Sequence, residues 1–204
     1  MSRDAILTRV RTALGRTPGQ LPPSLPSVYL RPSQPNLATF FACIERLNGK
    51  TYNAESEADA CRYVASLVKG KRAIASNSTV LEACGITGLD EVTTAAPGSL
   101  RSLCAECDIG ITSADYALAD TGTLVMFSSQ QEARMISLLP PLHVAVVPQS
   151  RMLGNLDELL SRVSHPADKT SAMVMITGPS RTGDIEQILV RGVHGPGEMH
   201  VVVI

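Results

Sequence analysis

The sequence predicts an α/β protein: a three-layer α/β/α domain with a mainly parallel sheet, plus helices at the N-terminus. Apolar runs of strand length, rich in Val, Ile and Ala, alternate with helical segments, which is typical of βαβ units. The runs at 143–148 and 199–204 are Val-rich without strict alternation, as in strands covered on both faces. With 204 residues, of which 44% are hydrophobic, the chain is long enough for one sizeable core.

The N-terminal part differs from the rest in composition. Ile6, Val10 and Leu14 recur at helical spacing, and six prolines between Pro18 and Pro35 exclude a continuous helix there. We therefore expect a helix and a proline-rich arm over 1–35, followed by the α/β domain over 36–204.

The order of elements follows from caps and periodicity. Asn36, Ser78, Ser99 and Asn155 are expected N-caps, and Ser56 or Glu55 is expected to open another helix. Helices are predicted at 37–47, 56–69, 79–84, 99–106, 155–163 and 184–191, with a helical turn at 114–120. Strands are predicted at 51–53, 72–76, 91–95, 108–112, 121–128, 143–148, 172–176 and 199–204. The strand at 121–128 follows 108–112 too closely for a helical crossover, so that pair is expected to be antiparallel.

Charge and cysteine content limit the partners. The net charge is −1 without a basic stripe, which argues against a nucleic-acid partner. No apolar run is long enough to span a membrane. Five cysteines without a signal peptide predict reduced thiols in the cytoplasm. Cys104 and Cys107 form a lone C-x-x-C, interpreted as two helix thiols because further ligands are distant, so neither a metal nor a cofactor is expected.

The stretch 177–196 has the pattern of a ligand site. A loop that leaves the carboxyl end of a strand and opens a helix is where open α/β sheets bind ligands. With Thr182 as the cap, Ser180 and Arg181 would face a bound anion. Asp184 and Glu186 would complement the helix dipole themselves, so a capped helix with a surface arginine is an equally good interpretation.

Two further segments contain candidate side chains. Asp120 lies in a turn before an apolar run, where a functional carboxylate and a turn carboxylate are equally good interpretations. Glu132 and Arg134 follow the strand at 121–128, and such a pair either suits a small carboxylic or phosphorylated substrate or belongs to a solvated loop. In the stretch 177–196, His194 is a further candidate, because it lies between glycines, where its side chain can reach a cleft.

Three long segments, at 114–125, 138–148 and 177–204, together resemble the LUD-domain family. The resemblance implies a fold similar to the NagB/RpiA/CoA transferase-like group. It also implies a place in a three-protein system that oxidises L-lactate to pyruvate, in which the two other proteins hold iron–sulfur clusters. This chain has no ferredoxin-type cysteine runs, so it is expected to be the cluster-free member with iron–sulfur proteins as partners.

The family motifs are matched here by Asp120, Thr121, Gly122, Glu132, Arg134, Ser180, Arg181, Thr182, Asp184, Glu186, His194 and Gly195. From these we expect proton transfer by Asp120, Glu132 or Asp184 and substrate binding by Arg134, Ser180, Arg181, Thr182 and His194. The alternative is a stand-alone enzyme acting on a small anion: a sugar phosphate, a hydroxy acid or a CoA thioester. The sequence leaves open whether this chain catalyses a reaction and whether it forms a homo-oligomer.

Overall fold

The computed structural model describes residues 2–15, 34–94, 98–183 and 189–204. The chain divides into two compact units, Met1–Leu30 and Arg31–Ile204, each described here by itself. In the first unit, helix α1 (Arg3–Leu14) begins at Ser2, whose side chain accepts from the Ala5 N–H, and ends at Gly15 in the left-handed conformation. This is the helix predicted from the spacing of its apolar residues.

The second unit is built on a six-stranded sheet in the order β1-β12-β7-β4-β2-β3. Every pair of neighbours in this sheet is parallel, which confirms the predicted α/β class with a mainly parallel sheet. Its strands are β1 (Lys50–Asn53), β2 (Ala73–Ala75), β3 (Val92–Thr94), β4 (Ile109–Ser113), β7 (Leu142–Val147) and β12 (Glu198–Val203).

Local capping explains where most helices begin. The side chains of Asn36, Ser56, Ser78 and Asn155 each accept a backbone N–H of the first turn, at 2.9–3.2 Å. The helices are α2 (Leu37–Arg46), α3 (Glu57–Val68), α4 (Thr79–Ala83), α5 (Leu100–Glu106), α6 (Arg134–Leu138) and α7 (Leu156–Arg162), with short 3₁₀ helices η1 (Ile86–Gly88), η2 (Gln149–Arg151) and η3 (Pro166–Asp168). None of the described helices has the length and apolar content needed to cross a bilayer.

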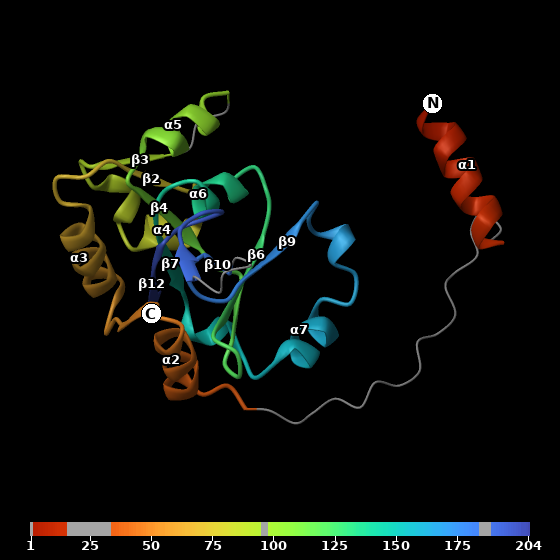
Figure 1. The fold of residues 1–204 in the computed structure, drawn as a ribbon. Coiled ribbons are helices and arrows are strands. Elements are labelled where there is room, and N and C mark those ends of the chain that lie inside the picture. The colour runs from red at the N-terminus through yellow and green to blue at the C-terminus, as the bar shows by residue number, and fades with distance from the viewer. Residues whose placement is uncertain (1, 16–33, 95–97, 184–188) are drawn as a thin grey trace. The chain divides into compact units, whose positions relative to one another are not determined.

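The two faces of the central sheet are covered differently (Figure 1). On one face, α3 and α4 bury Val64 and Leu81 against Ile111 and Val144. On the other face, α5 and α6 pack against β2, and α2 packs with a second sheet over β7 and β12. Helix α7 covers the far side of that second sheet. Burial on both faces explains why the central strands are apolar without alternation.

The second sheet has the order β8-β5-β6-β9 and corrects two predictions. Its strands are β5 (Tyr116–Leu118), β6 (Thr123–Phe127), β8 (Met152–Leu153) and β9 (Met173–Ile176). The segment 114–120 is not a helical turn, because Ala117 and Leu118 are buried on opposite faces of this sheet. The antiparallel pairing of 121–128 with 108–112 was also wrong, because β6 pairs with β5 and β9 while β4 pairs with β2 and β7.

A small hairpin replaces the helix predicted over 184–191. Strand β10 (Arg181–Gly183) pairs with β11 (Leu189–Arg191), so the helix prediction is wrong at 189–191, and 184–188 lie outside the described residues. Thr182 is therefore a strand residue opposite Val190 and not a helix cap. Two backbone bonds close the base of the hairpin: Ser180 N–H to the Pro196 carbonyl at 2.8 Å and Gly192 N–H to the Ser180 carbonyl at 3.2 Å.

Candidate functional site

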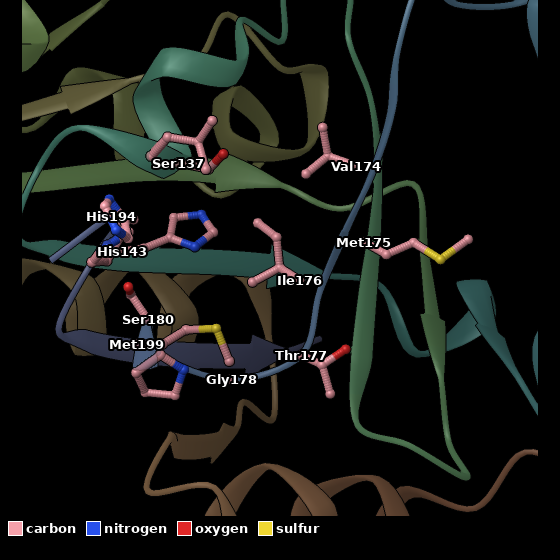
Figure 2. Close-up of a pocket in the computed structure, with 14 residues that line it drawn as sticks. Ser137, His143, Val174, Met175, Ile176, Thr177, Gly178, Ser180, His194 and Met199 are labelled. Carbon is pink, nitrogen blue, oxygen red and sulfur yellow. The ribbon is translucent and has the colours of Figure 1, made fainter. Parts of the chain in front are cut away.

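A cavity of about 220 Å³ lies at the amino ends of β7 and β12, and we call it the histidine pocket (Figure 2). Its walls come from α6, from the starts of β7 and β12, from the segment that includes and follows β9, and from the segment before β12. It is lined by Ser137, Leu138, His143, Val174, Met175, Ile176, Thr177, Gly178, Pro179, Ser180, His194, Gly195, Pro196 and Met199.

His143 is a buried polar residue of this pocket, with 1% of its surface exposed. Its Nε2 atom lies 2.8 Å from the Thr112 hydroxyl, and no hydrogen bond joins its Nδ1 atom to another described residue. Burial lowers the pKa of His143 to about 4. The imidazole is therefore neutral near pH 7 and has one nitrogen available to a ligand.

Close backbone packing brings α6 to this pocket. A Cβ atom at Gly110, which pairs with His143 across β4 and β7, would lie 1.9 Å from the Ile136 carbonyl oxygen. Only a glycine lets α6 approach the strand this closely. The approach carries Ser137, the next residue of α6, into the wall of the pocket.

A second group of polar side chains lies at the carboxyl ends of β2 and β4. Strands β2 and β4 are neighbours in the sheet. The chain connects β2 to β3 in one direction across the sheet and β4 to β7 in the opposite direction, so a topological switch point lies between β2 and β4. Open α/β sheets bind ligands in the crevice outside such strand ends. We call Ser76, Ser78, Ser113 and Glu132 the switch-point cluster.

The cluster includes buried polar atoms that make no hydrogen bond to a described residue. One carboxylate oxygen of Glu132, Oε1, accepts from the Ser113 hydroxyl at 2.6 Å, and that hydroxyl accepts from Ser78 at 2.7 Å. The other oxygen, Oε2, and the Ser76 hydroxyl are buried without a hydrogen bond to a described residue. Burial raises the pKa of Glu132, opposed by the bond from Ser113 and by the nearby Ser76 hydroxyl, which lies outside hydrogen-bond geometry.

A polar cavity of about 230 Å³ borders the cluster at Ser78. It is lined by Asn77, Ser78, Glu82, Thr87 and Thr94. Hydroxyl, amide and carboxylate oxygens thus predominate at this end of the sheet, whereas the histidine pocket has imidazoles, hydroxyls and apolar walls.

The structure separates the residues that the sequence suggested as one site. Ser180 and His194 line the histidine pocket, and Glu132 belongs to the switch-point cluster. Arg134 is exposed at the first residue of α6, and Asp120 is exposed in the turn between β5 and β6. Asp184 and Glu186 lie outside the described residues.

Arg181 contacts the end of α2. Its guanidinium donates to the Leu47 carbonyl, and the Asn48 amide, turned to accept, takes bonds from Arg181 at 3.0 Å and Arg191 at 3.1 Å. A cation at a helix C-terminus complements the helix dipole. In this arrangement one terminal nitrogen of Arg181, Nη2, binds backbone and amide oxygens of the protein itself, and its Nε atom is buried without a hydrogen bond to a described residue.

Sequence reasoning missed two features of these sites. His143 was placed only as the start of a strand, although a lone histidine inside the apolar run 142–147 is a usable signal. Ser76 and Ser113 follow or end buried strands, but only the strand order shows that they are neighbours.

The cysteines do not form a metal-ligand set among the described residues. Burial raises the pKa of both Cys104 and Cys107, and it raises that of Cys84 to about 11. These groups are therefore thiols and not thiolates near neutral pH.

Comparisons with known proteins agree with the fold. The family model of the LUD domain matches residues 37–204. Lactate utilization protein C of an Exiguobacterium species is 30% identical over 100% of this chain and 96% of its own length. Lactate utilization protein C of Bacillus subtilis is 41% identical over 95 residues, which are 45% of this chain and 40% of that protein. The crystal structure of a DUF162 family protein from Deinococcus radiodurans superposes with a TM-score of 0.65 at 18% identity, covering 82% of this chain and 94% of that one.

Proposed function

Because the chain belongs to the LUD domain family, we propose that it serves lactate utilisation as a cluster-free partner of iron–sulfur proteins that oxidise L-lactate to pyruvate. The observation that supports this role best is the similarity to a lactate utilization protein C along almost the full length of both chains. The proposed compartment is the cytoplasm, where the five free cysteines stay reduced.

The spacing of the cysteines supports the cluster-free part of the proposal. Ferredoxin-type clusters are held by closely spaced runs of cysteines, and this chain has no such run. In the proposed role, the iron–sulfur partners transfer the electrons. This chain contributes a small-ligand site, the histidine pocket, to which Ser180 and His194 belong.

A deletion strain and a tagged chain together test the proposal. The deletion is expected to abolish growth on L-lactate and to leave growth on glucose intact, and the tagged chain is expected to co-purify with an iron-containing protein from lactate-grown cells. A tagged, unrelated α/β protein serves as the control. Normal growth on L-lactate together with no iron in the eluate would refute the role.

One observation favours a second candidate, a stand-alone enzyme acting on a small anion. At a switch point, Glu132 has a buried oxygen without a hydrogen bond to a described residue and a pKa raised by burial, as is typical of a proton-transferring carboxylate. Thermal shifts against sugar phosphates, hydroxy acids and CoA thioesters would test it, with Glu132→Gln as the matched variant. If none of these compounds stabilises the protein, this candidate fails.

A further inference from the structure

The size of the histidine pocket distinguishes among the three ligand classes left open by the sequence. This step rests on the proposed small-ligand role of the pocket. Its volume of about 220 Å³ is below the roughly 300–1,000 Å³ of pockets that hold drug-sized ligands, so a CoA thioester does not fit within it.

The chemistry of the lining argues against a phosphate. Phosphate groups are typically bound by Arg or Lys side chains or by the N-terminus of a helix. The described residues that line the pocket include no Arg or Lys, and the segment that contains Ser180 leads into a strand. A sugar phosphate therefore lacks its usual partners here.

The remaining class, a short monocarboxylic acid, matches the groups that are present. Figure 2 shows the His143 ring projecting among Ser137, Ile176 and Met199. The Nδ1 atom of His143 and the hydroxyl of Ser180 make no hydrogen bond to a described residue, so both can contact a carboxylate. Ile176 and Met199 offer an apolar surface to a one- or two-carbon substituent.

The surroundings of His143 determine how a carboxylate would be neutralised. The elements packed around it contribute Thr112 from β4, Ser137 from α6 and Met199 from β12, none of which carries a charge. His194 is the other titratable side chain among the described residues that line the pocket. An anion in contact with a buried imidazole favours the protonated ring, so ligand binding and proton binding reinforce each other.

We propose that the histidine pocket binds a short-chain monocarboxylate, such as a hydroxy or oxo acid, and that His143 takes up a proton from solvent at Nδ1 as the ligand enters. The resulting N–H donates to one carboxylate oxygen, and the Ser180 hydroxyl donates to the other. His143 and Ser180 are thus the ligand-binding residues of the pocket.

Calorimetry with L-lactate and pyruvate tests this inference. Both acids stay ionised over the range used, so a change in affinity with pH reports on the protein. We expect the affinity to be at least about tenfold higher near pH 5.5 than near pH 7.5, since one coupled proton changes it by up to about tenfold per pH unit. Buffers of different ionisation enthalpy should show proton uptake. The uncharged isostere lactamide should bind more weakly and without uptake.

Two variants and a control separate binding from folding. His143→Gln should remove the pH dependence, and Ser180→Ala should weaken binding about tenfold at both pH values while retaining proton uptake. His165→Gln makes the same change at an exposed histidine outside the pocket and should bind like the parent. Thermal melts verify that each variant is folded.

Three results would overturn the inference: no binding of either acid at either pH, equal affinity for lactamide, or an unchanged pH dependence in a folded His143→Gln variant. These results are independent of the growth test. A chain that is needed for growth on L-lactate but binds no monocarboxylate would refute this inference and leave the proposed function standing.

Discussion

The histidine pocket and the switch-point cluster lie at opposite ends of the strands of one sheet, and they contain different kinds of buried polar group. In the pocket, His143 is neutral because burial lowers its pKa to about 4. In the cluster, burial raises the pKa of Glu132, and its Oε2 atom makes no hydrogen bond to a described residue. Burial thus disfavours a cation in one region and an anion in the other.

This difference teaches how one fold can offer two chemistries. In the pocket, binding of an anionic ligand requires protonation of the buried His143. In the cluster, hydroxyl and carboxylate oxygens can accept hydrogen bonds from a ligand. If the two regions behave separately, a substitution in one should leave the other unchanged.

The largest effect is expected at Gly110, where α6 contacts β4 and reaches the pocket. Gly110→Ala should destabilise the protein by about 3 kcal/mol or more, because its Cβ would clash with the Ile136 carbonyl oxygen. Urea unfolding measures the change. Gly88→Ala, where no heavy atom lies within 4 Å, is the control and should shift stability by less than about 0.5 kcal/mol. Equal effects at the two glycines would contradict the packing described.

His143 should make the stability of the protein depend on pH below neutrality. Its pKa falls from 6.5 when exposed to about 4 in the folded chain, so the unfolded state binds more protons between these values. Stability should therefore decrease by up to about 3 kcal/mol as the pH falls from about 6.5 to about 4. His143→Gln should remove this part of the decrease, as measured by urea unfolding at several pH values. A parallel pH profile in the variant would refute the assignment.

Arg181 should matter for stability more than for ligand binding. Arg181→Met removes the bonds to the Leu47 carbonyl and the Asn48 side chain, and a loss of about 2 kcal/mol is expected. Calorimetry with pyruvate should show nearly unchanged affinity in the folded variant. A large loss of affinity at full stability would instead support the anion-binding role suggested by the sequence.

Glu132 should make stability depend on pH in the opposite sense to His143. Burial raises the pKa of Glu132 in the folded chain, so the contribution of Glu132 to stability is fully present at low pH and is lost as the pH rises through the folded-state pKa. Glu132→Gln should therefore stabilise the protein at pH 7, by on the order of 1 kcal/mol. The gain should vanish at acidic pH in thermal melts. Destabilisation at pH 7 would mean that the ionised carboxylate is favoured.

Asp120 should have the smallest effect. It is exposed, and its backbone N–H donates to the Gly154 carbonyl, a bond that a side-chain change retains. Asp120→Asn should alter stability by less than about 0.5 kcal/mol and leave the affinity for pyruvate unchanged. A loss of growth on L-lactate in this variant would assign Asp120 a role that neither region explains.

The part of the fold that depends on local signals could be predicted from the sequence. Caps such as Asn36 and Asn155 act within one helical turn, so the local sequence shows them. The apolar run of β7 favours a buried strand whichever strands lie beside it. The segment that became β5 could not be predicted, because Ala117 and Leu118 suit a helix locally and become a strand only through pairing with β6 and β8.

The candidate sites likewise combine features that the local sequence shows with features that only the tertiary fold shows. Glu132, Ser180 and His194 were predicted as site residues from residue type and motif, but their grouping depends on strand order and on the β10–β11 hairpin. Nothing local in the sequence shows that β2 and β4 are neighbours or that α6 contacts Gly110. Tertiary packing likewise leaves the Nδ1 atom of His143 without a hydrogen bond to a described residue.

Amide hydrogen exchange with and without pyruvate at about pH 5.5 tests the separation of the two regions most directly. Slower exchange is expected at 137–143, 174–180 and 194–199, around the histidine pocket. Exchange at Ser76, Ser78, Ser113 and Glu132 should be unchanged. Protection of the switch-point cluster with no change around the pocket would contradict the account.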